Sequence, residues 1–488
     1  MVNNPDGSRS MFVFSGTSFS APQIAGAAAL LIQAFPNLTA ANVVDILLRS
    51  ARDAGAAGTD AVYGRGILDI AAAFAPQGTT ALAGSTAALP VGSTTVVTSA
   101  AMGDAASRSN GFAAIVLDGY GRAYQLDLSA GLRSASLTQK LGTALASEAR
   151  HTAVGNDRLS LAFSVDGRGR VARLPWQGKL QLSSDDADQS RVLAARVVSR
   201  TDRKTTLGLA MAQGSDGLVA ELQGRSRPAF LIAGSPQGNA GFNQTGEFSL
   251  ALRHQFGRWG FTASAERGLA LAGAPAEFAP GAGARNLGEP ARRIGLALDR
   301  GFGPASLSLG AIWLKEQRTV LGARLHDGFG QGGAQSLFLD ANGDWRFAGG
   351  WRLGGALRHG KTWAQTGGSV AKGSHFASLA WSLDLVRDGL FQSGDALALR
   401  LAQPLRVESG GLVLRLPAGY SYATLQPTYA FSAVSLAPRG RELDAELIWR
   451  GQAAEGNALV SLYYRHNPGH YAALPADKGV AVSWSKQF

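Results

Sequence analysis

The sequence predicts a mixed chain, in which a short piece of an α/β domain is followed by a linker and a C-terminal antiparallel transmembrane β-barrel. Three observations lead to this fold class. A serine-containing loop runs into an apolar stretch at residues 23–35, a later stretch is rich in Ala, Gly, Ser and Thr, and apolar and polar residues alternate repeatedly from about residue 156. Period-two alternation is typical of strands with two different faces. We therefore expect three parts, at residues 1–76, 77–155 and 156–488.

Composition narrows the classes of protein that fit. The chain of 488 residues is long enough for two or three domains, and it contains no cysteine, which excludes disulfides and thiolate metal sites. Its net charge of +11 comes from arginines scattered through the alternating segments. A nucleic-acid-binding surface would cluster these charges with aromatic platforms, so we expect no nucleic-acid partner. The sequence shows no motif for a metal or an organic cofactor.

Two kinds of membrane or export signal are missing from the sequence. No run of about eighteen apolar residues is present, which argues against a transmembrane helix. Residues 1–7 have neither the basic region nor the apolar region of a signal peptide.

The first part is organised around Ser18. Gly16 and Ala21 are small neighbours that leave the Ser18 hydroxyl open to a substrate, and Pro22 suits the first turn of a helix. We expect a loop at the serine and one helix over Ala21–Phe35, ended by the proline that follows. The positive end of that helix would lie beneath the hydroxyl, where it favours developing negative charge.

Two further helices are expected in the first part. Thr39 is a suitable cap for the second helix, and a short third helix is expected over Asp69–Phe74. The second helix carries apolar residues on the side that we expect to be buried, namely Val43, Val44, Ile46, Leu47 and Leu48. The first helix is so apolar that it needs a sheet to pack against, and the sequence offers no strands for it. We therefore expect the first part to be poorly folded on its own.

The first part resembles a known family of enzymes. The motif at Gly16–Pro22, with the run Ile24–Leu31 behind it, resembles the nucleophile segment of the subtilisin-like serine proteases. Two matches follow in the same order, since Leu38–Ala51 is similar to the next helix of that family and Tyr63–Asp69 is similar to its closing Tyr-Gly-x-Gly segment. The resemblance implies that Ser18 is the catalytic nucleophile of an endopeptidase that cleaves peptide or protein substrates by acyl transfer.

The catalytic triad is incomplete in this sequence. A serine hydroxyl needs a nearby base and a third group that orients it, and in subtilisin-like proteases the Asp and the His precede the Ser. Only seventeen residues precede Ser18, and they contain one acid, Asp6, and no histidine. Asn3 and Asn4 stand too close to Ser18 to match the oxyanion-hole asparagine of the family. The seven histidines all lie beyond the first part: His151, His254, His326, His359, His375, His466 and His470.

Two explanations for the missing triad members remain open. In the first, Met1 is a start inside a longer reading frame, and the complete protease carries its own Asp and His. In the second, the chain is a decayed or split gene product in which Ser18 does nothing alone. Under either explanation we expect the chain as given to have no appreciable peptidase activity.

Residues 77–155 form the predicted linker. Its first half has small residues and little charge, which is typical of a flexible or extended spacer. Ile115–Tyr124 predicts a strand, a turn and a second strand, while Leu137, Leu141 and Leu145 recur at a helical spacing. Such a helix would either thread a pore or pack against a domain.

Alternation dominates residues 156–488. Apolar residues share one face of the predicted strands at 159–165, 307–313, 379–385, 443–449, 460–464 and 480–484. The opposite face carries charges and hydroxyls, and Trp or Tyr recurs at the ends of the apolar rows. A membrane barrel with a wet interior therefore fits better than a soluble sandwich, which also alternates.

The end of the chain strengthens the barrel interpretation. The last strand, which ends at Phe488, resembles the C-terminal signature of Gram-negative outer-membrane proteins. The whole segment resembles an autotransporter translocator domain, which implies a barrel of about twelve strands. Four arginines, Arg358, Arg400, Arg450 and Arg465, are expected to face its interior, where they either line the pore around a linker segment or are ordinary charges of a wet lumen.

Together the three parts resemble the autotransporter serine proteases of Gram-negative bacteria. The resemblance implies an outer-membrane location, with the first part displayed at the cell surface. It also implies that outer-membrane lipid and the outer-membrane assembly machinery are partners of the chain. The alternative is a catalytically inactive outer-membrane barrel, structural or translocating, that carries a vestigial protease segment.

Overall fold

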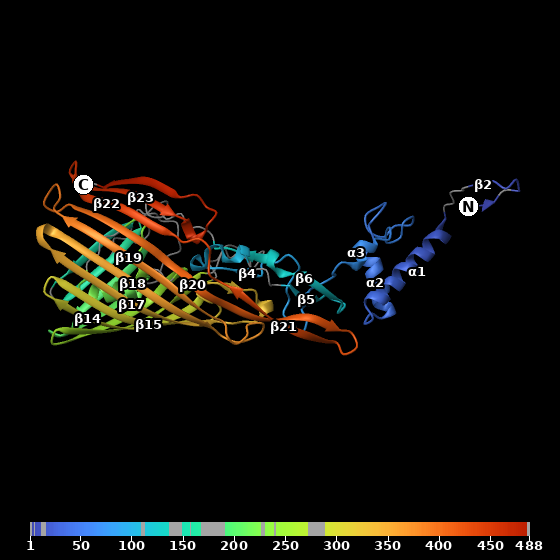
Figure 1. Cartoon of the computed structure of the whole chain (residues 1–488), viewed down its shortest axis with the longest axis horizontal. Helices are drawn as coiled ribbons and strands as arrows, with labels where there is room; N and C mark the ends of the chain where they lie inside the picture. The colour runs from blue at the N-terminus through green and yellow to red at the C-terminus, as the bar shows by residue number, and fades with distance from the viewer. Residues whose placement is uncertain are drawn as a thin grey trace. The chain divides into compact units, whose positions relative to one another are not determined.

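The computed structural model of the chain describes residues 2–3, 5–10, 16–108, 113–135, 149–156, 158–166, 191–225, 230–238, 241–271 and 288–485. It divides into two compact units, each with its own hydrophobic core. Unit 1 comprises residues 1–91, 113–127 and 416–430, and unit 2 comprises residues 92–112, 128–415 and 431–488. Figure 1 shows the helices of unit 1 in blue and the long strands of unit 2 from green to red.

Unit 1 contains the three predicted helices. They are α1 (Thr17–Ala34), α2 (Ala40–Ser50) and α3 (Ile70–Phe74), and a two-stranded sheet of β1 (Val2–Asn3) and β2 (Arg9–Ser10) precedes them. Thr39 and Asp69 are the N-caps of α2 and α3, with side-chain oxygens that accept hydrogen bonds from the amides of Asn42 and Ala72. Across the described residues, no helix combines the length and the apolar character that a bilayer crossing requires.

The core of unit 1 forms where the three helices meet. It consists of Leu31, Phe35, Val43, Ile46 and Ala73. The expectation that Val44 and Leu48 are buried is wrong, because their exposed fractions are 56% and 47%. Residues 43, 46 and 47 recur at helical spacing on one side of α2, and the other helices cover only that side.

Much of α1 is also apolar and exposed. Phe19, Ile24, Leu30 and Ile32 are each about half exposed. Only Ala27 and Leu31 are buried on this helix.

A hairpin completes unit 1 and matches the predicted strand, turn and strand. Its strands are β5 (Ala113–Leu117) and β6 (Ala123–Asp127), and β3 (Ala81–Leu82) pairs with β5. In the turn, the Asp118 carboxylate accepts hydrogen bonds from the amides of Tyr120 and Arg122, each at 3.0 Å. These bonds within four residues stabilise the turn between the two strands.

The stretch expected to be a flexible spacer is folded where it enters unit 2. Residues 94–99 are buried, and β4 (Val96–Val97) pairs with β7 (Leu132–Arg133) and with β16 (Arg324–Leu325). A 3-10 segment, η1 (Ala100–Arg108), follows. A Cβ added to Gly131 would lie 2.4 Å from the Ser93 carbonyl oxygen, so the small residues here allow close backbone packing. The predicted helix around Leu137–Leu145 lies outside the described residues.

One antiparallel sheet of sixteen strands dominates unit 2. Its strands are β8 (Ala149–Gly155), β9 (Leu159–Asp166), β10 (Arg191–Arg200), β11 (Thr205–Met211), β12 (Asn243–Phe256), β13 (Trp259–Leu271), β14 (Gly288–Phe302), β15 (Ala305–Glu316), β17 (Ala334–Phe347), β18 (Trp351–Ala364), β19 (His375–Asp388), β20 (Ala396–Ser421), β21 (Gln426–Ser435), β22 (Leu443–Ala453), β23 (Gly456–His466) and β24 (Asp477–Ser485). Among the described residues β8 and β24 are its edges, and β21 pairs with β20 beside the main path.

The sheet contains more strands than the twelve or so that the sequence suggested. Strands such as β12 mix Ala, Gly, Arg and His into the alternation, so their period of two is weak in the sequence. The loop predicted at Ala270–Pro290 is shorter than expected, because β13 continues to Leu271 and β14 already begins at Gly288. Phe488 lies outside the described residues.

The connections of the sheet alternate between short and long. Tight turns at residues 201–204, 257–258, 303–304 and 348–350 join strand pairs at one end of the sheet. The longest described connection, residues 212–242, belongs to the opposite end because neighbouring strands are antiparallel. This asymmetry is typical of outer-membrane barrels.

The two faces of the sheet differ in polarity. On β14, Ile294 and Leu296 are 62% and 50% exposed, whereas Arg293, the residue directly before Ile294, is 3% exposed. The same reversal recurs along the sheet. Its exposed face includes Leu252, Leu309, Leu339, Leu357, Leu383 and Val482, and its buried face includes Ser249, Thr262, Asp340, Thr362, Glu446 and Ser461. A soluble sandwich buries its apolar face, so the polarity here is inverted.

The long connection between β11 and β12 folds against the buried polar face. It contains α6 (Ser215–Leu222) and a short 3-10 turn, η4 (Pro236–Gly238). Glu266 on β13 accepts hydrogen bonds from the Ser215 amide at 2.8 Å and from its hydroxyl at 2.7 Å. Asp216 forms an ion pair with Arg293 on β14 at 2.8 Å. Charged groups thus hold α6 to the sheet.

A second part of the same connection is bound to the same polar face at more distant strands, β20 and β22. The Glu446 carboxylate on β22 accepts hydrogen bonds from the amides of Leu231, Ile232 and Ala233, at 2.8–2.9 Å. Arg400 on β20 donates to the Ala233 carbonyl at 3.1 Å. The amides of residues 231–233 and the carbonyl of Ala233 are therefore held by side chains of the sheet.

The arginines expected in the interior are mostly buried in ion pairs. Arg358 pairs with Asp340 at 2.8 Å, Arg400 with Asp384 at 2.6 Å, and Arg465 with Glu442 at 2.8 Å. Arg450 is partly buried. These partners match ordinary interior charges.

Candidate functional site

Ser18 lies in the first turn of α1 rather than in a loop before it. The helix begins at Thr17, four residues earlier than expected, so Ser18 is its second residue. Gly16 is the N-cap with an extended backbone (φ 165°, ψ 155°), and no side chain caps the helix. The Phe19 amide donates to the Gly16 carbonyl at 3.1 Å. Ser18 therefore stands among the first amides of the helix, which have no acceptor four residues earlier within it.

Pro22 has a different role from the one expected. It stands inside α1, at the sixth helical position, instead of in the first turn. Proline has no amide hydrogen, so the Ser18 carbonyl, four residues earlier, has no intrahelical donor. The first turn is therefore tied less firmly to the helix than an unbroken ladder would tie it.

The Ser18 side chain is open to solvent. Every residue from Gly16 to Gly26 is exposed, and a Cβ on Gly16 would meet no atom within 4 Å. The amide groups of the first turn and the positive end of the helix would stabilise negative charge that develops beside this hydroxyl. The arrangement suits a nucleophile, but it supplies no base.

The residues that precede Ser18 do not complete a triad. The Asp6 carboxylate accepts hydrogen bonds from the Ser8 hydroxyl at 2.7 Å and from the Ser8 amide at 3.0 Å. The Ser8 hydroxyl, and then its amide, lower the pKa of Asp6. Asn3 pairs opposite Arg9 in the small sheet, and Asn4 lies outside the described residues. None of the seven histidines belongs to unit 1.

The Tyr-Gly-x-Gly segment has a clear structural reason for its second glycine. Gly66 has φ +116°, and a Cβ there would lie 2.3 Å from the Arg52 carbonyl oxygen. The Arg52 and Ile67 backbones exchange hydrogen bonds at 2.8 and 2.9 Å beside it. Only glycine combines this positive φ with such a close approach.

An aspartate that the sequence analysis missed organises the loop before this segment. Asp60 accepts hydrogen bonds from the amides of Val62 and Tyr63 at 2.7 and 2.6 Å, and from Ala56 at 3.2 Å. The bonds from Tyr63 and Val62 lower the pKa of Asp60. An aspartate just before a glycine-rich turn is the sequence signal for such bonding.

A buried arginine that the sequence analysis also missed joins the hairpin to the helices of unit 1. Arg122 is 0% exposed and pairs with Asp118 at 2.8 Å. It donates to the carbonyls of Ala73 and Ala75 at 2.6 and 2.9 Å, and it lies 5.1 Å from the centre of the Phe35 ring. Asp118 and Arg122, four residues apart across a Gly-containing turn, were the available signal.

No metal site is evident in the described ranges, where no three potential His, Cys, Asp or Glu ligands come together. Several solved structures resemble the chain at low similarity. They include OmpT of Vibrio cholerae, with 9% identity and a TM-score of 0.30 over 59% of this chain and 77% of that chain. A structure of Pseudomonas putida OprB has 11% identity and a TM-score of 0.32 over 66% and 81% of the two chains.

Sequence relatives match short segments of the chain. The neisserial autotransporter lipoprotein NalP of Neisseria meningitidis is 49% identical over 55 residues, which are 11% of this chain and 5% of that protein. The serotype-specific antigen 1 of Mannheimia haemolytica is 47% identical over 55 residues, which are 11% and 6% of the two chains. Mycosin-1 of Mycobacterium tuberculosis is 40% identical over 73 residues, covering 15% and 16%. The match therefore spans a small fraction of each relative.

A family model also matches one part of the chain. The subtilase family matches residues 5–66, which include Ser18, the three α1–α2 core positions Leu31, Val43 and Ile46, and the segment up to Gly66. Residues 5–66 of this chain therefore resemble part of the subtilase family.

Proposed function

We propose that the chain is an outer-membrane autotransporter of the serine-endopeptidase kind, in which residues 5–66 supply the nucleophile segment and unit 2 is the membrane barrel. The observation that carries this proposal is the inverted polarity of the sixteen-stranded sheet, in a chain that also holds a subtilase segment. In this proposal residues 1–76 are the displayed protease segment, residues 77–155 the connector and residues 156–488 the translocator.

The inverted sheet is suited to lipid. Its exposed leucines and valines would face hydrocarbon, and its buried charges are paired with one another inside. Trp259, Trp345 and Trp351 stand at the short-turn ends of β13, β17 and β18, where an aromatic belt meets the membrane interface. In lipid an open sheet leaves edge amides unsatisfied, so we propose that the sheet closes into a barrel.

Gel mobility tests the barrel. Because a closed barrel resists detergent at room temperature, the full chain folded in detergent should migrate differently before and after boiling. A chain that stays soluble without detergent and shows no heat shift would contradict the membrane assignment. This measurement does not depend on Ser18.

In the proposed chemistry, the Ser18 hydroxyl attacks the carbonyl carbon of a peptide bond and forms an acyl-enzyme, which water then hydrolyses. A base must take the hydroxyl proton, and unit 1 has no histidine to do so. We therefore propose that the 488-residue chain alone has no appreciable peptidase activity. The autotransporter proposal also includes peptide or protein substrates for the complete protease, and outer-membrane lipid and the outer-membrane assembly machinery as partners.

Fluorophosphonate labelling tests the nucleophile. We expect the isolated chain to label no faster than its Ser18→Ala variant, with Ser20→Ala as a matched control in the same exposed turn. Brisk peptide hydrolysis that Ser18→Ala abolishes would overturn the proposed inactivity. In outer membranes of the source cells, labelling of a protein that contains residues 5–66 would support a working protease.

The second candidate function is an inactive barrel with a vestigial protease segment. The exposed apolar side of α1 favours it, because it describes a helix without its usual packing partner. If no species in those membranes labels at Ser18 while the barrel still shows its heat shift, this candidate replaces the first.

A further inference from the structure

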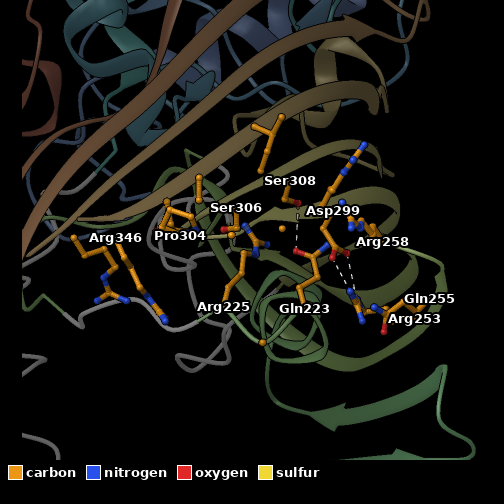
Figure 2. A pocket seen from close by; sticks show the side chains of 18 residues that line it. Gln223, Arg225, Arg253, Gln255, Arg258, Asp299, Pro304, Ser306, Ser308 and Arg346 are labelled. Carbon is orange, nitrogen blue, oxygen red and sulfur yellow. Dashed lines mark hydrogen bonds and ion pairs between the residues drawn. The ribbon is translucent and has the colours of Figure 1, made fainter. Parts of the chain in front are cut away.

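Unit 2 holds a cavity of about 320 Å³ beside the short turns of β12–β13, β14–β15 and β17–β18. Six arginines line it, Arg225, Arg253, Arg258, Arg300, Arg346 and Arg352, with two aspartates, Asp299 and Asp344. Figure 2 shows several of these side chains around the cavity, with Gln223, Ser306 and Ser308 between them. The wall therefore carries an excess of four positive charges.

Strand register brings two of the arginines face to face. Arg346 on β17 is the direct cross-strand partner of Arg352 on β18. Like charges directly opposite each other in a sheet are destabilising. An anion between them would remove this cost.

The carboxylates of the cavity neutralise only part of the charge. Asp299 is engaged with Arg253, whose Nη2 lies 2.6 Å from the carboxylate. Arg300 lies 4.8 Å from the ring centres of both Trp259 and Phe302. Among the described residues, neither Arg258 nor Arg346 forms an ion pair.

A buried hydrogen-bond donor also faces this wall. The Gln223 side-chain oxygen accepts from the Ser308 hydroxyl at 3.3 Å, whereas its amide nitrogen is buried without an acceptor in the described part of the chain. A buried amide without a partner is costly. A ligand that only accepts hydrogen bonds would satisfy this amide and the arginines together.

We propose that this cavity binds a soluble anion that carries a phosphate group. The planar guanidinium fork matches phosphate oxygens, and a phosphate monoester brings close to two negative charges where a carboxylate brings one. Arg253 and Arg352 lie toward the less exposed side of their strands, away from the apolar face that lipid would cover. The ligand therefore comes from solution rather than from a lipid headgroup. The site is independent of Ser18 and of peptidase activity.

Calorimetric titration with inorganic phosphate tests the site. The full chain is folded in nanodiscs of phosphatidylcholine, and ionic strength is held constant with chloride. We expect saturable binding, weakened about tenfold by Arg346→Gln and by Arg258→Gln, because each variant loses charge-assisted hydrogen bonds to the anion. Arg203→Gln, in the exposed turn between β10 and β11, is the matched control and should leave the affinity unchanged.

A gain-of-affinity variant guards against loss by misfolding. Asp299→Asn removes the negative charge that competes for Arg253, so it should tighten phosphate binding several-fold. Non-saturable binding, or equal weakening by Arg203→Gln, would overturn the proposal as general charge attraction. If phosphate does not bind but phosphatidylglycerol nanodiscs stabilise the wild type and not Arg346→Gln, the ligand is a lipid headgroup and the proposed soluble source is wrong.

Discussion

At the scale of single residues, Arg122 is the clearest case of one side chain that joins separate elements. Its guanidinium contacts the Asp118 carboxylate, the end of α3 and the Phe35 ring at the end of α1. All of these partners belong to unit 1. Removing one member of a buried ion pair leaves the other charge uncompensated, which makes this residue sensitive to substitution.

We expect Arg122→Met to lower the free energy of unfolding of unit 1 by about 3–5 kcal/mol. Hydrogen exchange of the α3 and β6 amides in the full chain measures the change. Arg65→Met is the matched control, since Arg65 is exposed, and should shift exchange by less than about 0.5 kcal/mol. Equal protection in the two variants would show that Arg122 does not join these elements.

A second residue-scale prediction concerns pH. The Tyr120 hydroxyl donates to Asp45 at 2.6 Å, and this bond, followed by the one from Arg49, lowers the pKa of Asp45 below its ordinary value of 3.8. A lowered folded-state pKa stabilises the fold above the ordinary value, and the stabilisation disappears as the pH falls through the folded value. We expect the melting-temperature difference between wild type and Asp45→Asn to be constant near neutral pH, to shrink as the pH falls below the ordinary value of 3.8, and to vanish below the folded value.

Tyr120→Phe supplies the check on that prediction. Because it removes the hydroxyl that donates to Asp45, its difference from wild type should shrink over the same acidic range. A difference that persists unchanged at the lowest pH would mean that the tyrosine acts by packing and not through the carboxylate.

At the scale of elements, the helices and caps of unit 1 follow from local sequence, and their packing does not. Thr39 and Asp69 cap their helices through bonds within three residues, so the sequence alone predicts them. Val44 and Leu48 were assigned to the wrong side because burial on α2 depends on which partners are present. The start of α1 was missed because Pro22 suggests a first turn, while the structure accommodates it within the helix.

The glycine-rich end of the subtilase segment allows a prediction that separates strain from collision. Gly58 and Gly66 both have positive φ, at +90° and +116°, but only Gly66 has backbone atoms where a Cβ would be. We expect Gly66→Ala to destabilise unit 1 by about 1–3 kcal/mol more than Gly58→Ala, because overpacking adds to the backbone strain. The destabilisation by each variant is measured from urea unfolding curves in which the hydrogen exchange of the Arg52 and Ile67 amides is the probe. Equal costs would mean that the loop shifts freely to make room.

In the sheet, the sequence predicts the alternation but misses how the interior is filled. Long stretches of period two identified the strands, while Glu266, Glu446 and their amide partners join segments up to about two hundred residues apart. No local pattern encodes such contacts. The same reason explains the missed cavity, because its arginines come from several separate turns.

At the scale of the whole molecule, unit 2 couples its sheet to the connection packed inside it. If the sheet closes as proposed, α6 and residues 231–233 occupy its interior, so we expect small single-channel currents in planar bilayers. Glu446→Ala removes the acceptor of three amides and should raise the current several-fold. Glu455→Gln, in the exposed turn between β22 and β23, is the matched control. Large currents in the wild type would show that the connection does not obstruct the pore.

The inverted polarity of the sheet has a consequence for how this protein is purified and kept folded. A surface of leucine and valine cannot reach its lowest free energy in water, so if unit 2 is the proposed barrel, hydrocarbon acts as its structural partner. Its stability is then a joint property of the protein and its surroundings, and it should vary with the chain length of the detergent or lipid. A melting temperature quoted without the amphiphile describes only half of that system.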